Sequence, residues 1–123
     1  MKNNAVNWFE IFVSNMTQAQ TFYETILDEK LTLAEMEGCS MAIFPFAENA
    51  GVGGALTQME GHKPGAGGTL VYLNVEGKLD AVLGRVPAAG GKVVKGRTDI
   101  SPHGYIGLFE DQEGNIVGLH SMK

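Results

Sequence analysis

Apolar side chains recur with strand-like and helix-like spacing in two similar halves of this 123-residue chain. Residues 6–13 predict an apolar strand, and the residues after it predict a helix, because their apolar side chains fall on one helical face. Asn15 is the predicted N-cap of this helix, with Gln18 three residues later as in a capping box. The apolar face is expected to pack on a sheet and consists of Ala19, Phe22, Tyr23, Ile26 and Leu27.

The remaining pattern gives both halves the same plan. In the first half it predicts three more strands, at residues 31–36, 39–45 and 52–59. The second half predicts a strand at 69–75, a helix with Leu79, Val82, Leu83 and Val86 on one face, and strands at 92–97, 105–110 and 115–121. We therefore expect an α+β fold of two tandem βαβββ modules in one domain of residues 1–123: module one at about 1–60, a glycine-rich linker at 60–68 and module two at 69–123.

Several short motifs occur in order along this plan. Val13 and Asn15 are followed by the pair Phe22-Tyr23, and the second half contains Gly90-Gly91, Gly104-Tyr105 and a closing hairpin at residues 109–120. Together they resemble the glyoxalase/bleomycin-resistance/dioxygenase superfamily, also called the vicinal oxygen chelate fold, over nearly the whole chain. The closing strand is similar to that of small glyoxalase-like proteins. The resemblance implies curved mixed sheets around a cavity, and a homodimer.

The resemblance also implies a divalent metal, held by His or Gln on the first strand of each module and by Glu on the last. By the motifs, three of these positions fall on Trp8, Leu70 and Gly118, and none of them offers a lone pair to a metal. The fourth position depends on the strand register, and its candidates are Gly54, Ala55 and Leu56, with Gln58 and Glu60 as the nearest polar side chains. The sequence therefore predicts a chain without the metal of the family and without another cofactor.

Side chains with the same strand parity as the missing ligands are expected to line a small-molecule cavity. They are Trp8, Glu10 and Phe12 on the first strand, Leu70, Tyr72 and Asn74 on the fifth, and Gly118 and His120 on the last. Glu10 interrupts an apolar strand, so it is a candidate general acid or base, with His120 as the second catalytic candidate. The alternatives are that Glu10 only bonds a neighbouring strand or a partner subunit, and that His120 is solvated near the chain end.

Two function classes stay open. One is a glyoxalase-like protein that binds a small organic molecule without the metal and performs lyase- or isomerase-type acid–base chemistry. The other is a non-catalytic drug- or metabolite-binding protein of the bleomycin-resistance type. A net charge of −5 argues against a nucleic-acid partner. No apolar run has the length of a membrane span or the pattern of a signal peptide, so we expect a cytoplasmic protein with no membrane partner.

Overall fold

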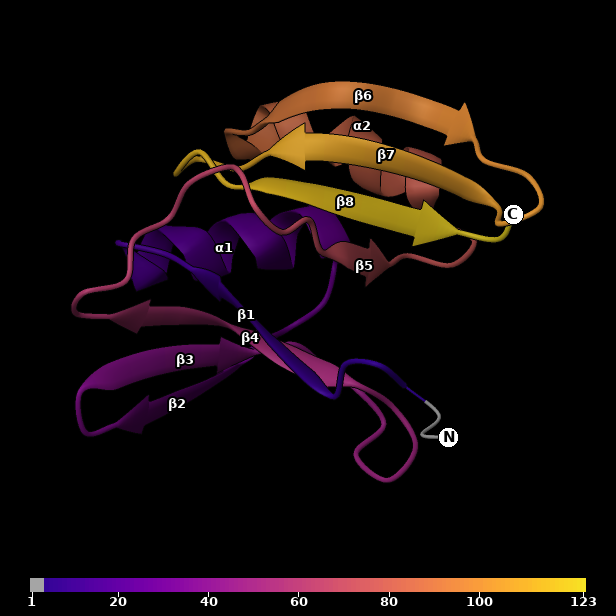
Figure 1. The fold of residues 1–123 in the computed structure, drawn as a ribbon. Coiled ribbons are helices and arrows are strands. Elements are labelled where there is room, and N and C mark those ends of the chain that lie inside the picture. The colour runs from indigo at the N-terminus through magenta and orange to yellow at the C-terminus, as the bar shows by residue number, and fades with distance from the viewer. Residues whose placement is uncertain (1–3) are drawn as a thin grey trace.

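The chain folds into two βαβββ modules, and the structure, a computed structural model, describes residues 4–123 (Figure 1). The first module contains β1 (Trp8–Phe12), α1 (Met16–Leu27), β2 (Thr32–Met36), β3 (Cys39–Ile43) and β4 (Gly53–Met59). The second contains β5 (Tyr72–Asn74), α2 (Leu79–Ala89), β6 (Lys92–Asp99), β7 (Tyr105–Glu110) and β8 (Ile116–Ser121). The α+β prediction with two tandem modules is confirmed.

Each module forms a four-stranded mixed sheet, and the two sheets have the same topology. The strand orders are β1-β4-β3-β2 and β5-β8-β7-β6. The first strand of each module is therefore an edge strand, and it pairs in parallel with the last strand of that module. Within residues 4–123 no helix is long and apolar enough to cross a membrane.

Helix α1 begins where the sequence predicts. The side chain of Asn15 accepts a hydrogen bond from the Gln18 amide at 3.1 Å, which satisfies one of the unpaired amides of the first turn. A carboxylate from the other module joins this cap, because Glu113 accepts hydrogen bonds from the amide of Ser14 at 2.7 Å and the amide of Asn15 at 3.3 Å. A negative charge is favourable at a helix N-terminus, so this contact fastens the second module to α1.

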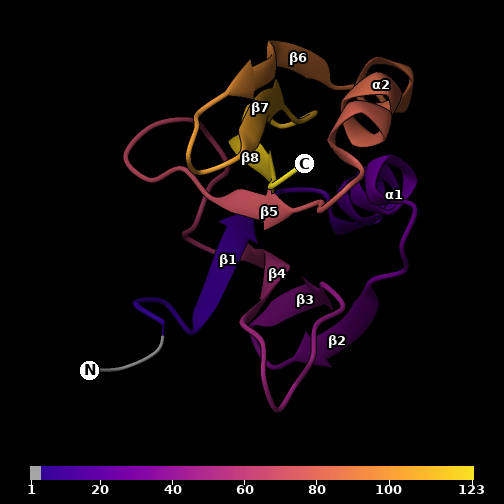
Figure 2. The same cartoon turned by 90° about the vertical axis from the view of Figure 1, so that its right-hand side faces the viewer.

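One hydrophobic core joins the two modules. Helices α1 and α2 lie side by side on the same side of the two sheets (Figure 2). The rings of Tyr23 on α1 and Phe109 on β7 are both fully buried, with centroids 6.0 Å apart. Arg85 on α2 donates to the carbonyl of Ile26 at 2.9 Å. The linker between β4 and β5 is thus not the only connection between the modules.

Strand β5 is shorter than the predicted strand at residues 69–75. It contains only Tyr72–Asn74, and residues 69–71 are irregular. The chain enters this strand from Gly67 and Gly68, whose φ angles of 115° and 75° belong to turns rather than strands. The first ladder contact is the hydrogen bond from the Gly118 amide to the Val71 carbonyl at 2.8 Å. Leu70 therefore approaches the sheet as part of the linker.

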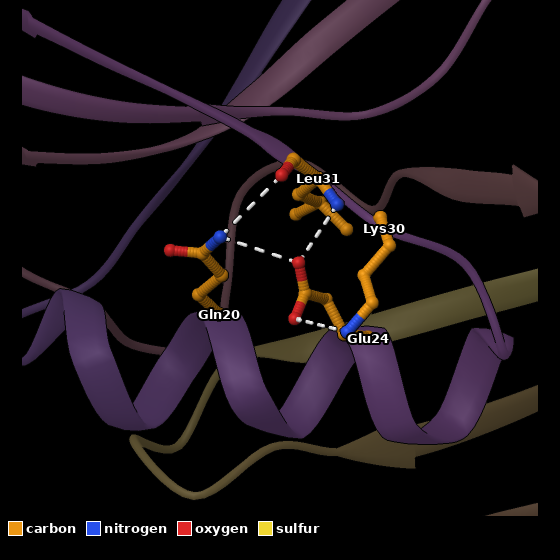
Figure 3. A network of polar contacts seen from close by, with 4 residues as sticks. All are labelled: Gln20, Glu24, Lys30 and Leu31. Carbon is orange, nitrogen blue, oxygen red and sulfur yellow. Dashed lines mark hydrogen bonds and ion pairs between the residues drawn. The ribbon is translucent and has the colours of Figure 1, made fainter.

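A polar network fixes the chain where it leaves α1 for β2 (Figure 3). One carboxylate oxygen of Glu24 accepts the Leu31 amide at 2.9 Å and the Gln20 side-chain amide at 3.2 Å, and the other lies 4.0 Å from the Lys30 ammonium. The hydrogen bond from the Leu31 amide is the main reason why the pKa of Glu24 lies below its usual value. The ionised carboxylate therefore stabilises this turn.

Replacing this carboxylate with a neutral amide, in Glu24→Gln, is expected to lower the free energy of unfolding by about 0.5–1 kcal/mol at pH 7. Because the folded pKa is lowered, the contribution of Glu24 is present above its unfolded pKa and is lost as the pH falls through the folded value. Urea unfolding of both proteins at pH 7 and pH 3 should show a smaller difference at pH 3. An equal difference at both pH values would assign the effect to packing instead.

Candidate functional site

A cleft of about 1130 Å³ lies between the modules, and the edge strands β1 and β5 both line it. The linker and the loop between β3 and β4 also contribute to the lining, and their lining residues are Phe44, Pro45, Phe46, Val52, Lys63, Gly65, Gly67, Gly68 and Thr69. Six of the side chains expected at a cavity line this cleft: Trp8, Glu10, Phe12, Leu70, Tyr72 and Asn74. Alternation puts the β1 and β5 members of this set on the face opposite the buried Ile11 and Leu73. Ile11 and Leu73 also border the cleft, so both faces of the edge strands contribute to its lining.

Glu10 lies on the exposed side of β1 and is oriented by its neighbour. The indole N–H of Trp8 donates to one Glu10 carboxylate oxygen at 3.1 Å. Trp8 is 37% exposed, and its ring meets Phe46 edge to face, with centroids 6.2 Å apart. At the other end of β1, the ring of Phe12 contacts the His62 imidazole at 4.8 Å. The carboxylate therefore lies between aromatic side chains and stays open to solvent.

Gly118 lies under the ring of Tyr72 instead of opening into the cleft. The two residues are paired across β5 and β8, and a Cβ atom added to Gly118 would come within 2.3 Å of the Tyr72 ring. The first module repeats this contact, since Phe9 pairs with Gly54 and a Cβ there would lie 2.2 Å from the Phe9 ring. In both modules glycine on the last strand makes room for an aromatic ring from the first.

His120 does not line the cleft, contrary to the expectation from strand parity. Its imidazole Nε2 lies 2.6 Å from the carbonyl oxygen of His103, in the loop between β6 and β7. His120 pairs with the cleft residue Asn74 across β5 and β8, but its imidazole is held at the loop between β6 and β7 and does not contribute to the cleft lining. Glu10 and His120 are therefore not brought together as an acid–base pair.

The residues at the expected metal positions do not fit a divalent metal. The side chains of Trp8 and Leu70 have no atom that could bind a metal, and the Tyr72 ring fills the space that a carboxylate at Gly118 would need. On β4, the residues paired with Trp8 and Glu10 are Gly53 and Ala55, neither of which has a side chain that could bind a metal. Gln58 points to the helix side, where its side-chain oxygen accepts the Met16 amide at 2.9 Å. In the described part of the chain, His, Cys, Asp and Glu side chains form no group of three or more that could hold a metal ion.

Asn115 is a cleft residue that parity reasoning missed. Its side-chain nitrogen donates to the Phe12 carbonyl at 2.9 Å, and its side-chain oxygen accepts the Gly65 amide at 2.8 Å. One buried side chain thus ties β1, the linker and the closing hairpin together. The sequence signal for it was a polar residue immediately after the turn glycine Gly114, inside an otherwise apolar hairpin.

Asp111 holds Asn115 in place. Its buried carboxylate accepts hydrogen bonds from the Asn115 side chain at 2.9 Å, the Asn115 amide at 3.0 Å, the Glu113 amide at 2.8 Å and the Tyr23 hydroxyl at 2.9 Å. Burial, with the negative charge of Asp111 beside it, raises the pKa of Tyr23 well above its usual value. Tyr23 therefore remains a neutral donor at physiological pH.

The charged side chains that line the cleft are Glu10, Glu29 and Lys63. Among residues 4–123 the ion pairs join Lys30 to Glu24 and Arg97 to Asp80. None of the three cleft charges is therefore neutralised by an ion pair with the described residues. Lys63 belongs to the linker, whose path hydrophobic periodicity does not encode, so no sequence signal placed this ammonium at the cleft.

Comparisons with known proteins agree with this architecture. The model of the Glyoxalase/Bleomycin resistance protein/Dioxygenase superfamily matches residues 5–119. A glyoxylase/bleomycin resistance protein/dioxygenase domain from Frankia sp. EAN1pec superposes with a TM-score of 0.73 at 19% identity, covering 99% of this chain and 100% of that chain.

Two further structures show the same fold. A glyoxalase/bleomycin resistance protein from Albidiferax ferrireducens T118 has a TM-score of 0.69 at 14% identity, over 96% of this chain and 98% of that one. The fosfomycin resistance protein FosX from Listeria monocytogenes has a TM-score of 0.65 at 13% identity, over 98% and 92%. No curated protein sequence matches this chain.

Proposed function

Because the chain belongs to the Glyoxalase/Bleomycin resistance protein/Dioxygenase superfamily, we propose that it binds a small organic molecule in the cleft between β1 and β5, without the divalent metal. The observation that carries the proposal is the cleft of about 1130 Å³, whose lining combines aromatic walls with a few polar groups. The same lining has no metal donor at Trp8 or Leu70. The cleft thus provides a binding surface in place of a metal centre.

Of the two forms of this function, the geometry supports binding without catalysis better. General acid–base catalysis needs a carboxylate or imidazole positioned at the reacting atom. Glu10 is exposed, and His120 lies outside the cleft against the His103 carbonyl. We therefore propose a drug- or metabolite-binding protein of the bleomycin-resistance type, acting as a homodimer in the cytoplasm.

Acid–base chemistry through Glu10 is the second candidate, and one contact favours it. The Trp8 indole N–H donates to one Glu10 oxygen, and the other accepts no hydrogen bond from the described residues. If Glu10 acts as a base, turnover has a bell-shaped dependence on pH and is lost in Glu10→Gln. A protein that only binds its ligand shows no turnover, whether residue 10 is glutamate or glutamine.

Native mass spectrometry of gently purified protein tests the proposal. We expect a dimer that lacks a stoichiometric divalent metal and that retains an organic adduct. The adduct should be lost in a Trp8→Ala/Tyr72→Ala variant, because both rings line the cleft. A Leu33→Ala/Met36→Ala variant is the matched control, since it removes two exposed apolar side chains from β2, outside the cleft. A bound divalent metal at one per chain would refute the metal-free site.

A further inference from the structure

We propose that the cleft selects organic cations, namely small amines or quaternary ammonium compounds with an apolar or aromatic body. This inference rests on the proposed small-molecule function and adds the chemical class of the ligand to it. Three properties of the cleft carry the inference: the aromatic rings around Glu10, the unpaired carboxylate itself and the charge of the surrounding module.

Three aromatic rings, those of Trp8, Phe12 and Tyr72, line the cleft together with Glu10. Trp8 and Phe12 lie on the same face of β1, each two residues and so about 7 Å away from Glu10. Tyr72, 44% exposed, faces the same cleft from β5. The faces of tryptophan, tyrosine and phenylalanine rings attract cations, most strongly when the cation is alkylated and weakly hydrated. A neutral apolar ligand would also bind such rings, so the choice of a cation depends on the carboxylate.

The Glu10 carboxylate is ordered but not neutralised. The Trp8 indole donates to one of its oxygens at 3.1 Å, and neither described ion pair involves Glu10. A ligand cation placed between the rings can therefore meet a preoriented negative charge without displacing a protein cation. The combination of ring faces with a carboxylate is the arrangement by which proteins recognise ammonium groups.

The charge of the first module extends this preference beyond the contact distance. Residues 1–60 contain eight Asp and Glu residues against two Lys residues, whereas the rest of the chain is nearly balanced. Two of the three charged side chains that line the cleft are the carboxylates Glu10 and Glu29, and an excess of one sign of charge concentrates ions of the opposite sign. Lys63 is the opposing charge in the lining, and it follows His62, which packs on Phe12 at the end of β1 opposite Trp8. The ligand's cationic group is therefore expected to bind at the Trp8 end of the cleft.

The test uses Trp8, the only tryptophan of the chain, as its own reporter. Three probes of similar size are titrated against the purified protein: benzyltrimethylammonium, benzyl alcohol and phenylacetate. We expect benzyltrimethylammonium to change the Trp8 emission saturably and to bind roughly tenfold more tightly than the other two. Glu10→Gln should weaken this probe roughly three- to tenfold and leave benzyl alcohol unchanged, since glutamine retains the acceptor for the indole N–H.

Glu37→Gln is the matched control, because it removes the same charge from the exposed turn between β2 and β3, outside the cleft. Equal affinity for the cation and the alcohol, unaffected by Glu10→Gln, would overturn the cation preference and leave the binding function intact. Absence of saturable binding by the cation overturns the cation preference as well. If native mass spectrometry then also shows no organic adduct, the proposed function fails with it.

Discussion

Replacing the buried carboxylate of the closing hairpin, in Asp111→Ala, is expected to lower the free energy of unfolding by about 3 kcal/mol or more. Asp111 accepts four hydrogen bonds, including those from the Tyr23 hydroxyl and the Asn115 side chain. Each buried donor that loses its acceptor costs about 1–3 kcal/mol. Since a domain of this size is stable by only about 5–15 kcal/mol, urea unfolding should show a much lower midpoint.

The same substitution should also loosen the cleft, because Asn115 transmits the constraint. With its partner removed, the Asn115 side chain no longer has a fixed orientation for the Phe12 carbonyl and the Gly65 amide. Hydrogen exchange at the Gly65 amide should therefore accelerate in Asp111→Ala more than global destabilisation requires. Glu37→Ala is the control, since it removes an exposed carboxylate and should change neither measurement. A loss of stability below about 1 kcal/mol would show that water replaces the carboxylate.

Most of the fold could be predicted from the sequence, because the burial of α1, α2 and the longer strands follows local periodicity. The N-cap at Asn15 and the strand at Tyr105–Glu110 are where the pattern placed them. Strand β5 was predicted too long because residues 69–71 fit a strand pattern in the sequence. In the structure they follow the turn glycines Gly67 and Gly68 and remain irregular until the strand begins at Tyr72. Periodicity reports which face a residue takes, and it does not report where pairing with a distant strand begins.

The candidate site was predictable only where it depends on strand parity. Alternation puts Trp8, Glu10 and Tyr72 on the faces of β1 and β5 opposite the buried Ile11 and Leu73, and all three line the cleft. His120 has the same parity and pairs with Asn74, but its imidazole contacts the His103 carbonyl instead of lining the cleft. Lys63 reaches the cleft from a linker whose path no local pattern determines. Asn115 owes its role to contacts with Phe12 and Gly65, which are 103 and 50 residues away in the chain. Such contacts depend on packing between the modules.

Restoring the carboxylate of the family's metal site, in Gly118→Glu, is expected to destabilise the protein by about 1–3 kcal/mol and to give no metal binding. A Cβ atom at Gly118 would lie 2.3 Å from the Tyr72 ring, so the ring must leave its position over β8. The matched control is Gly96→Glu on β6, where an added Cβ meets no atom within 4 Å. Isothermal titration with Zn²⁺ should show no heat of binding for either variant, because Trp8 and Leu70 still offer no donor.

The decisive measurement is the coupling between Gly118 and Tyr72. If the ring causes the conflict, Tyr72→Ala makes room for the new side chain. The double variant should then lose less free energy of unfolding than the two single variants together, by about 1–2 kcal/mol. Additive losses, or a Gly118→Glu variant as stable as Gly96→Glu, would contradict the steric conflict. A coupled pair would mean that a carboxylate at position 118 alone does not restore the metal site, because the Tyr72 ring fills the space beside Gly118 and forms part of the cleft wall. Recovery of a metal site would then require changes on β1, β4 and β8, at Leu70, and at Tyr72 together.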